Sequence, residues 1–369
     1  MTAARRWCLV LAGAAVLLVA PLAVRALPAD DSEITATDLL ERVQQSAAVP
    51  HTGYAESVGS LQLPVADEFS ELAALLGERS RLRVWWRGVD DWRVDAIDPA
   101  GETDLFHNGL TTTSWDYQAE RAVVTPEPTI RLPRSADLLP PQLARLALDD
   151  ALPEEVSRLP AERIAGQDAP GLRLEPSMPQ STIDHVDVWA DEDTGLPLQV
   201  EVWGVDSTLA AVSSTFLDVS LATPSAEVTQ FVAPATAEVV VEDVFDVAAG
   251  ADRFSEAVAP RRLAGLATRP GTPQDRPVGQ YGRGLTTMVA VPLWDQAADP
   301  LREQLLDTPG ARIGSAGVAL TVGPLNLRLA PEFGREDRSW LVAGTVDAAT
   351  VTHATRRLHG VDYTSRPVG

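Results

Sequence analysis

The stretch that decides the fold is Arg81-Leu-Arg-Val-Trp-Trp-Arg87, followed by the segment Trp92–Ile97. In the first segment Leu82, Val84 and Trp86 alternate with arginines, and in the second the apolar residues alternate with arginine and aspartate. Strict alternation places apolar side chains on one face of a β-strand and charged side chains on the other. The two segments therefore predict neighbouring strands of a sheet that has one apolar and one charged face.

Turn signals and three further segments extend this pattern into an antiparallel meander over residues 81–124. Asn108-Gly109 is a strong hairpin signal because both residues tolerate positive φ. The remaining predicted strands of the meander are Thr103–His107, Thr112–Tyr117 and Glu120–Val124. One face of such a sheet is apolar, and it needs a cover or a ligand.

Short helices and more strands surround the meander. A helix is predicted over Thr37–Gln45, with Thr35-x-x-Asp38 as a variant capping box at its start. A second helix is predicted over Gln142–Asp149. Period-two alternation then predicts further strands at Ala169–Leu174, Thr182–Ala190, Leu198–Trp203 and Ser213–Val219.

A second unit is expected after a linker at residues 236–262. It has a helix from Asp299-Pro300 to Leu306, with Asp as N-cap and Pro at the first helical position. Arg269–Arg283 is expected to be an exposed loop. The other predicted elements are Leu285–Leu293, Gly317–Leu329, Trp340–Val346 and a closing helix over Ala348–Leu358. The expected division is a leader at 1–26, a first domain at 32–235 and a smaller α+β domain at 263–369.

The N-terminus has the features of an export leader. Arg5-Arg6 precede an uncharged run from Trp7 to Val24, and the run ends in a small-residue cleavage site at Ala26. The leader is either cleaved or kept as a membrane anchor, since the run is just long enough to span a bilayer. In both cases the chain is expected to be extracytoplasmic, in the cell envelope or secreted. Cys8, the only cysteine, lies inside this leader, so disulfides and thiol chemistry are excluded from the rest.

Composition excludes one class of partner. The chain has a net charge of −22, and removal of the three arginines of the leader leaves 27 arginines against 52 acidic residues, or −25. Nucleic acid would repel such a chain. The absence of lysine and the scarcity of asparagine indicate a GC-rich coding sequence, as in an actinobacterium.

No motif points to catalysis, to a cofactor or to a metal. The histidines occur singly, without the spacing of a metal site. Ile313-Gly-Ser-Ala-Gly317 lacks the first glycine of a nucleophile elbow, so a turn is the preferred interpretation. Asp191-x-Asp193-x-Gly195 has no closing glutamate, which favours a hairpin turn over a calcium loop. We therefore expect a protein that is not an enzyme, with no catalytic residues, no cofactor and no metal.

The apolar face of the sheet is the candidate binding surface. Its side chains either pack as an ordinary core or line a cavity for an acyl chain, because concave apolar pockets enclose such ligands. Trp85, Trp189 and Trp203 are expected on the opposite face. The candidate ligand-binding residues are Leu82, Val84, Trp86, Trp92, Val94, Trp115, Tyr117, Val188, Val200 and Val202.

Several of these segments together resemble the LolA-like lipoprotein-carrier fold. The resemblance is carried by Arg81–Ile97, Asn108–Tyr117 and above all Val186–Leu198, in which V-D-V-W-x-D-x-x-T-G-L-P-L forms a hairpin. It covers about residues 35 to 235. Pro260–Leu266, Tyr281–Leu285 and Val342–Val346 are similar to the small second domain of RseB/MucB-type regulators of sigma-E.

This resemblance implies an α+β protein, a curved antiparallel half-barrel covered by helices, plus a smaller α+β C-terminal domain. It implies a binding protein that holds a lipid, acyl or other apolar ligand in the half-barrel. By the same resemblance the protein regulates a membrane-bound signalling protein of the anti-sigma-factor type. The alternative that the resemblance leaves open is a lipid or lipoprotein carrier, a LolA-like shuttle.

Overall fold

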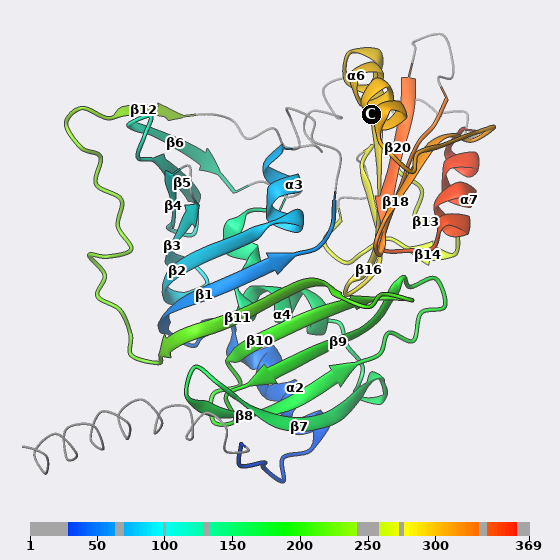
Figure 1. Cartoon of the computed structure of the whole chain (residues 1–369). Coiled ribbons are helices and arrows are strands. Elements are labelled where there is room, and N and C mark those ends of the chain that lie inside the picture. Colours follow the sequence, from blue (N-terminus) through cyan, green and yellow to red (C-terminus); the bar gives the residue numbers. More distant parts are fainter. Residues whose placement is uncertain are drawn as a thin grey trace, which may run out of the picture.

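The computed structural model describes residues 29–62, 70–98, 101–127, 133–241, 258–272, 277–331 and 338–359. The predicted leader at 1–26 lies outside the described residues. The chain is mostly sheet with a smaller share of helix, and the strands form a large curved sheet of twelve and a second sheet of six (Figure 1).

The large sheet follows the chain order of two meanders joined through β1 (His51–Gly59). From one edge to the other its order is β12-β6-β5-β4-β3-β2-β1-β11-β10-β9-β8-β7. The strands are β2 (Arg79–Gly88), β3 (Asp91–Asp98), β4 (Gly101–His107), β5 (Thr111–Asp116), β6 (Arg121–Pro126), β7 (Val156–Ile164), β8 (Gln167–Leu174), β9 (Ile183–Ala190), β10 (Pro197–Gly204), β11 (Ala210–Ser220) and β12 (Glu238–Val241).

The five strands predicted over residues 81–124 are confirmed as β2–β6. Trp86 pairs with Trp92, and Val84 with Val94, so the apolar residues of β2 and β3 share one face. Arg83 pairs with Asp95 on the other face. The later strands are also confirmed, as β8 to β11, whereas β7 was not predicted. Pro160 interrupts the alternation there, and β7 is an edge strand, where proline is tolerated.

Two short helices belong to the same hydrophobic core as the large sheet. The predicted helix near residue 37 is α2 (Ala36–Gln45), and the Thr35 side chain accepts a hydrogen bond from the Asp38 backbone at its start, as expected. The predicted helix near residue 142 is α4 (Pro140–Leu148). It follows the 3₁₀ turn η2 (Ser135–Leu138) and begins with two prolines, which fit the first helical turn. In Figure 1 both helices lie behind the strands. A further helix, α3 (Ser70–Gly77), contacts β1 and β2.

The six-stranded sheet has the order β15-β16-β20-β19-β18-β17. The closing helix is confirmed as α7 (Ala348–His359), which contacts β19 and β20. The strands are β15 (Gly279–Arg283), β16 (Thr286–Trp294), β17 (Arg312–Gly314), β18 (Gly317–Val322), β19 (Leu325–Leu329) and β20 (Arg338–Gly344), and the short hairpin β13 (Arg262–Leu263) with β14 (Leu266–Ala267) precedes them.

Two expectations for this second sheet are wrong. The helix α6 runs over Asp295–Asp307 and holds Pro300 inside it, so Pro300 is not at the first helical position. Proline favours the first turn of a helix because the backbone N–H groups there have no partner within the helix. Proline can also stand further inside a helix, as Pro300 does, where one backbone hydrogen bond is lost. Arg269–Arg283 is not wholly an exposed loop either, because its last residues form β15 and Tyr281 is fully buried.

The chain stays with the large sheet beyond the boundary expected at residue 235. β12 pairs in parallel with β6, and Glu238 stands opposite Arg121. Residues 221–237 thus connect β11 to the far edge of the sheet, and Figure 1 shows this connection as a long excursion. The start of the linker predicted at 236–262 therefore belongs to the sheet.

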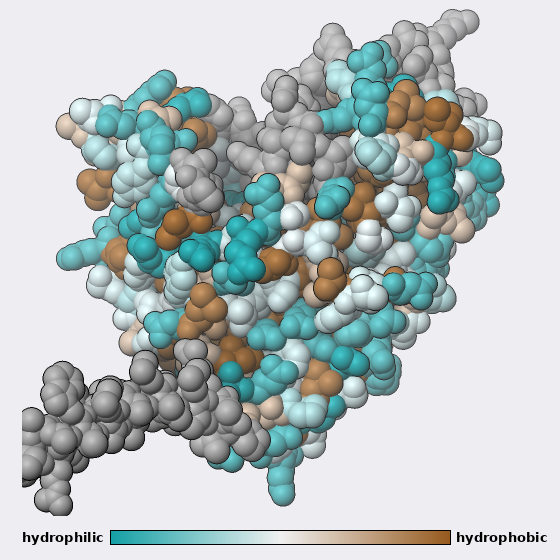
Figure 2. Space-filling model, viewed as in Figure 1, coloured by the Kyte–Doolittle hydropathy of each residue, from teal (hydrophilic) through white to brown (hydrophobic). Residues whose placement is uncertain are grey.

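The visible surface is mostly hydrophilic. On the side shown in Figure 2, hydrophobic residues form small separate groups among polar ones. In the described parts of the chain, no helix has the length and apolar character needed to cross a membrane.

Removal of a core side chain from the meander should destabilise the whole sheet. Leu82 is fully buried, whereas Leu110 in a turn is 81% exposed. We expect Leu82→Ala to lower the free energy of unfolding by about 2–5 kcal/mol, because it removes apolar contacts and leaves a cavity. Leu110→Ala should change it by less than about 0.5 kcal/mol. Denaturant unfolding followed by circular dichroism measures both, and equal effects would contradict the packing described here.

Candidate functional site

The candidate site is the face of the large sheet that carries the apolar side chains of β2, β3, β9 and β10, called here the apolar face. Eight of the ten predicted ligand-binding residues lie on it in one contiguous hydrophobic cluster. None of the eight is more than 6% exposed. They are Leu82, Val84, Trp86, Trp92, Val94, Val188, Val200 and Val202.

The other two predicted residues, Trp115 and Tyr117, are not on the apolar face. His107 pairs with both Trp92 and Thr112, so the even-numbered residues of β5 continue the apolar face. Trp115 pairs with Asp104 on the opposite face. Tyr117 contacts Trp115 there and is 52% exposed. The face predicted for these two residues is wrong, because a strand register that differs by one residue exchanges the two faces.

The side chains of α2, η2 and α4 pack into the same cluster as the apolar face, and we call η2 and α4 the cover. The cover is joined to the sheet by a buried hydrogen bond that Ser214 Oγ of β11 donates to the Leu138 carbonyl. Gln44 of α2 donates to the Leu148 carbonyl at 2.7 Å, which joins the two helices. The buried apolar residues of these elements include Leu39, Leu40, Val43, Leu138, Leu139, Leu143, Ala144, Ala147 and Leu148.

A row of stacked rings crosses one end of the apolar face. The ring centroids of His51 and Trp86 are 5.9 Å apart, those of Trp86 and Trp92 are 5.6 Å apart, and those of Trp92 and His107 are 5.0 Å apart. The Arg134 guanidinium lies 5.4 Å from the Trp92 ring centroid, within cation–π range. Trp86 Nε1 donates to the Ala47 carbonyl, so the row is also fixed to the segment after α2.

His51 is an uncharged member of this row. Burial lowers the pKa of His51 to about 4, against the opposing effect of its hydrogen bond with the Val49 carbonyl. Its Nε2 is buried and has no hydrogen-bond partner among the described residues. At neutral pH the row is therefore an apolar and aromatic surface with no ionised imidazole at His51.

The closed packing determines what this site can do. Since the eight side chains of the apolar face are covered, they present no open surface to a ligand in this conformation. An acyl chain can reach them only if the cover moves away. The arrangement is chemically suited to apolar binding.

The opposite face is not simply a solvated charged face. Trp189 is buried and donates from Nε1 to the Pro160 carbonyl of β7, and Trp203 stacks on His185. Trp85 lies beneath Arg93, whose guanidinium is 5.0 Å from its ring centroid. All three tryptophans are on this face, as predicted, and segments that sequence alone did not identify cover Trp189.

Two aspartates are buried on the opposite face beside Trp85. Asp95 is 0% exposed and Asp104 is 1% exposed. Arg93 donates to both carboxylates, at 2.6 Å to Asp95 and 2.7 Å to Asp104. Burial and the neighbouring Asp95 carboxylate raise the pKa of Asp104 to about 7, while Arg93 acts in the opposite direction.

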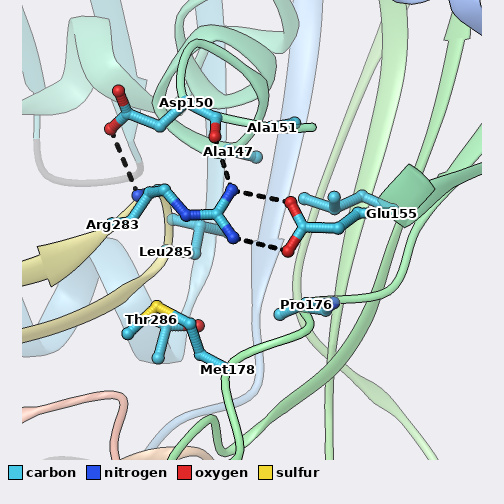
Figure 3. A pocket seen from close by; sticks show the side chains of 11 residues that line it. Ala147, Asp150, Ala151, Glu155, Pro176, Met178, Arg283, Leu285 and Thr286 are labelled. Carbon is cyan, nitrogen blue, oxygen red and sulfur yellow. Dashed lines mark hydrogen bonds and ion pairs between the residues drawn. The ribbon is translucent and has the colours of Figure 1, made fainter. Parts of the chain in front are cut away.

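A small pocket lies where the two sheets meet (Figure 3). Its volume is about 20 Å³, which is room for about one water molecule and not for an acyl chain. Arg283 of β15 points into it and donates to both carboxylate oxygens of Glu155, at 2.5 and 2.7 Å. The same guanidinium donates to the Asp150 carbonyl at 2.6 Å. This pocket is a contact between the sheets, fixed by one bidentate ion pair.

Sequence reasoning missed the polar residues that hold these parts together. Ser214 and Glu155 have no motif around them, and Arg283 lies in Tyr281–Leu285, which was singled out only for its similarity to RseB/MucB-type regulators. Their roles depend on partners more than seventy residues away in sequence, Leu138 and Arg283. No local signal could have identified them.

Comparison with known proteins gives a resemblance of fold. No protein-family model and no curated protein matches the sequence. The structure is similar to MucB in complex with MucA(peri), with a TM-score of 0.48 and 18% identity over 87% of this chain and 97% of that chain. It is also similar to the MucA/MucB complex of Pseudomonas aeruginosa, with a TM-score of 0.49 and 18% identity over 87% of this chain and 96% of that chain.

A LolA superfamily protein from Nitrosomonas europaea matches with a TM-score of 0.23 and 13% identity, over 54% of this chain and 98% of that chain. The similar structures are thus of the two kinds that the sequence motifs indicated, MucB-type and LolA-type. At these TM-scores and identities, the similarity assigns no ligand, partner or activity to this chain.

The ion pair between the sheets should make stability depend on pH. Although burial opposes it, hydrogen bonds from Arg283, Ser177 and two backbone amides lower the pKa of Glu155 from 4.5 to about 2. A lowered carboxyl pKa stabilises the folded state above pH 4.5, and this contribution is lost as the pH falls toward 2. We expect Arg283→Gln to destabilise the protein by about 3 kcal/mol at pH 7, and by about half of that or less at pH 3.

The matched control is Arg312→Gln, because Arg312 is exposed on β17. Denaturant unfolding at pH 7, 5 and 3 measures both variants. A loss for Arg283→Gln that does not change with pH, or an equal loss for the control, would contradict the role assigned to Glu155.

Proposed function

We propose that this chain is an extracytoplasmic binding protein that holds an acyl chain or similar apolar ligand between the apolar face and its cover. Its six-stranded sheet and helices would dock a membrane-bound signalling protein of the anti-sigma-factor type. No covalent step belongs to this function, and no cofactor is required. The observation that carries the proposal is that eight apolar side chains of one sheet face are covered by elements that are not strands of that sheet.

The attachment of the cover supports exchange for a ligand. η2 and α4 contribute no backbone ladder to the sheet, and they are held by side-chain packing and by the Ser214–Leu138 hydrogen bond. Strands, in contrast, could leave only by breaking a row of backbone hydrogen bonds. The cover is therefore the part that can separate from the apolar face while the sheet stays intact.

Burial of the cover and burial of an acyl ligand contribute free energies of about the same size. The cover buries Leu138, Leu139, Leu143 and Leu148, and each buried leucine contributes about 1.5–3 kcal/mol, or on the order of 10 kcal/mol together. A sixteen-carbon chain also contributes on the order of 10 kcal/mol at about 0.8 kcal/mol per CH₂. Since association has its own entropic cost, exchange would be near balance. A ligand of this size can replace the cover without a large net cost.

The partner class comes from the resemblance and not from a contact in this chain. MucB has been solved in complex with MucA(peri), and the second domain of the RseB/MucB type is implied by Tyr281–Leu285 and Val342–Val346. The alternative function, a lipid or lipoprotein shuttle, uses the same apolar face and needs no signalling partner.

Native mass spectrometry of protein purified from its own host tests the binding function. We expect retained mass that corresponds to an acylated or lipid molecule, and co-purification of a membrane signalling protein. Retained lipid without such a protein would favour the shuttle. Protein that carries no apolar molecule, and that does not take up a fatty acid when one is supplied, would contradict both functions.

Loosening the cover should be measurable without knowledge of the ligand. Ser214→Ala removes the buried donor to the Leu138 carbonyl, a loss of about 1 kcal/mol. We therefore expect hydrogen exchange of the backbone amides of residues 135–148 to become about five times faster. Ser213→Ala, on the other face of the same strand, is the matched control. Equal exchange in both variants would show that this hydrogen bond does not hold the cover.

A further inference from the structure

A second site is built into the opposite face of the sheet, on the hairpin of β3 and β4. Asp95, Glu102 and Asp104 each offer one carboxylate oxygen, and these three oxygens lie within 4.8 Å of one another. Asp95 and Asp104 are fully buried and directly opposite each other in register, and Glu102 is half-buried. Like charges directly opposite on neighbouring strands are destabilising. Such a cluster needs a compensating positive charge.

The protein supplies only part of that charge. Arg93 donates to Asp95 and Asp104, and it accounts for one unit against three carboxylates. Arg83 is 3.9 Å from Asp95, but its side chain is 47% exposed, so its contribution is small. Glu102 has no ion pair or side-chain hydrogen bond in the described part of the chain. With all three carboxylates ionised, the cluster is thus short of nearly two positive charges.

An unsatisfied atom in the cluster points to a ligand. Asp104 is 1% exposed, and its Oδ1 has no hydrogen-bond partner among the described residues, while Oδ2 accepts from Arg93. A buried carboxylate oxygen without a partner is costly, and native proteins rarely leave one. This observation is independent of the number of acids, and it places in the cluster a buried oxygen to which no basic side chain or backbone amide of the described residues donates.

We propose that Asp95, Glu102 and Asp104 bind one hard divalent cation of the calcium class. Calcium takes oxygen ligands at 2.3–2.6 Å, so ligand oxygens around one ion lie up to about 4.8 Å apart, as these three do. Three carboxylates and no nitrogen or sulfur donor favour calcium or magnesium over transition metals. The two charges of the ion match the charge that Arg93 leaves uncompensated.

The surroundings define how the ion enters and what else faces it. Glu102 is the half-buried member, so the ion reaches the buried aspartates past this residue. Trp115 stands opposite Asp104 on β5, and Trp85 stands opposite Arg93 on β2. The charged or titratable groups that face the site are Arg83 on β2, Arg93 on β3 and Tyr117 after β5. Waters would complete the coordination of the ion.

Terbium luminescence tests this site, because Tb³⁺ replaces Ca²⁺ and is excited through a neighbouring tryptophan. We expect the purified full chain to show sensitised Tb³⁺ emission that Ca²⁺ displaces, and calorimetry with Ca²⁺ alone to give one site with a dissociation constant of about 0.1–1 mM. Glu102→Gln and Asp104→Asn should each weaken binding by about tenfold or more. Trp115→Phe should reduce the emission and leave the calorimetric affinity for Ca²⁺ unchanged.

The control for nonspecific binding to this acidic protein is Glu227→Gln, since Glu227 is exposed and outside the cluster. Thermal unfolding without added metal checks that each variant is folded. Emission that is the same in Glu102→Gln, Asp104→Asn and Glu227→Gln would show that Tb³⁺ binds elsewhere and would overturn the proposal. Absence of Ca²⁺ binding to the unaltered protein at millimolar concentration would overturn it as well, and Arg93 and a proton would then be the only compensation.

Discussion

The packing of a helical cover on the apolar face is the interaction on which the rest of this structure depends. Leu82, Val84 and Val94 are fully buried, although the neighbouring strands lie beside theirs in the sheet and do not cover its face. Without η2 and α4, that face would expose a large apolar surface to water, which soluble proteins avoid unless it is a binding site. The cover therefore closes the fold and, at the same time, occupies the place where a ligand would lie.

The two faces of the large sheet bury different kinds of side chain. The apolar face buries hydrocarbon and stacked rings, in which a charged imidazole is disfavoured and the pKa of His51 is accordingly low. The opposite face buries charge, and Arg93 links two aspartates between Trp85 and Phe106. Phe231, from the connection between β11 and β12, packs on Phe106 and Trp115 and helps to shield this face. The alternation of residues would place the two aspartates in solvent, yet they are buried. The cation binding proposed above is a specific role that accounts for this burial.

Sequence patterns predicted the local elements well and their environment poorly. Alternation in Arg81–Arg87 and Trp92–Ile97 was sufficient for β2, β3 and their pairing, because period-two burial is a local property. The face of Trp115 depended on the register after Asn108-Gly109, which no alternation in the strand itself reveals. The shielding of Phe106 and Trp115 depends on Phe231, in the connection after β11 and far away in sequence. The hydrogen bond between Ser214 and Leu138 joins elements with no shared pattern, so it could be found only in three dimensions.

Contact between an acyl chain and the apolar face can be measured directly by fluorescence quenching. A brominated fatty acid quenches tryptophan fluorescence only at short range, and Trp86 and Trp92 lie on that face, whereas Trp115 lies on the opposite one. If an acyl chain binds between the apolar face and its cover, quenching should be saturable, lost in a Trp86→Phe, Trp92→Phe double variant and kept in Trp115→Phe. Absence of quenching, or quenching that persists in the double variant, would contradict binding between the apolar face and its cover.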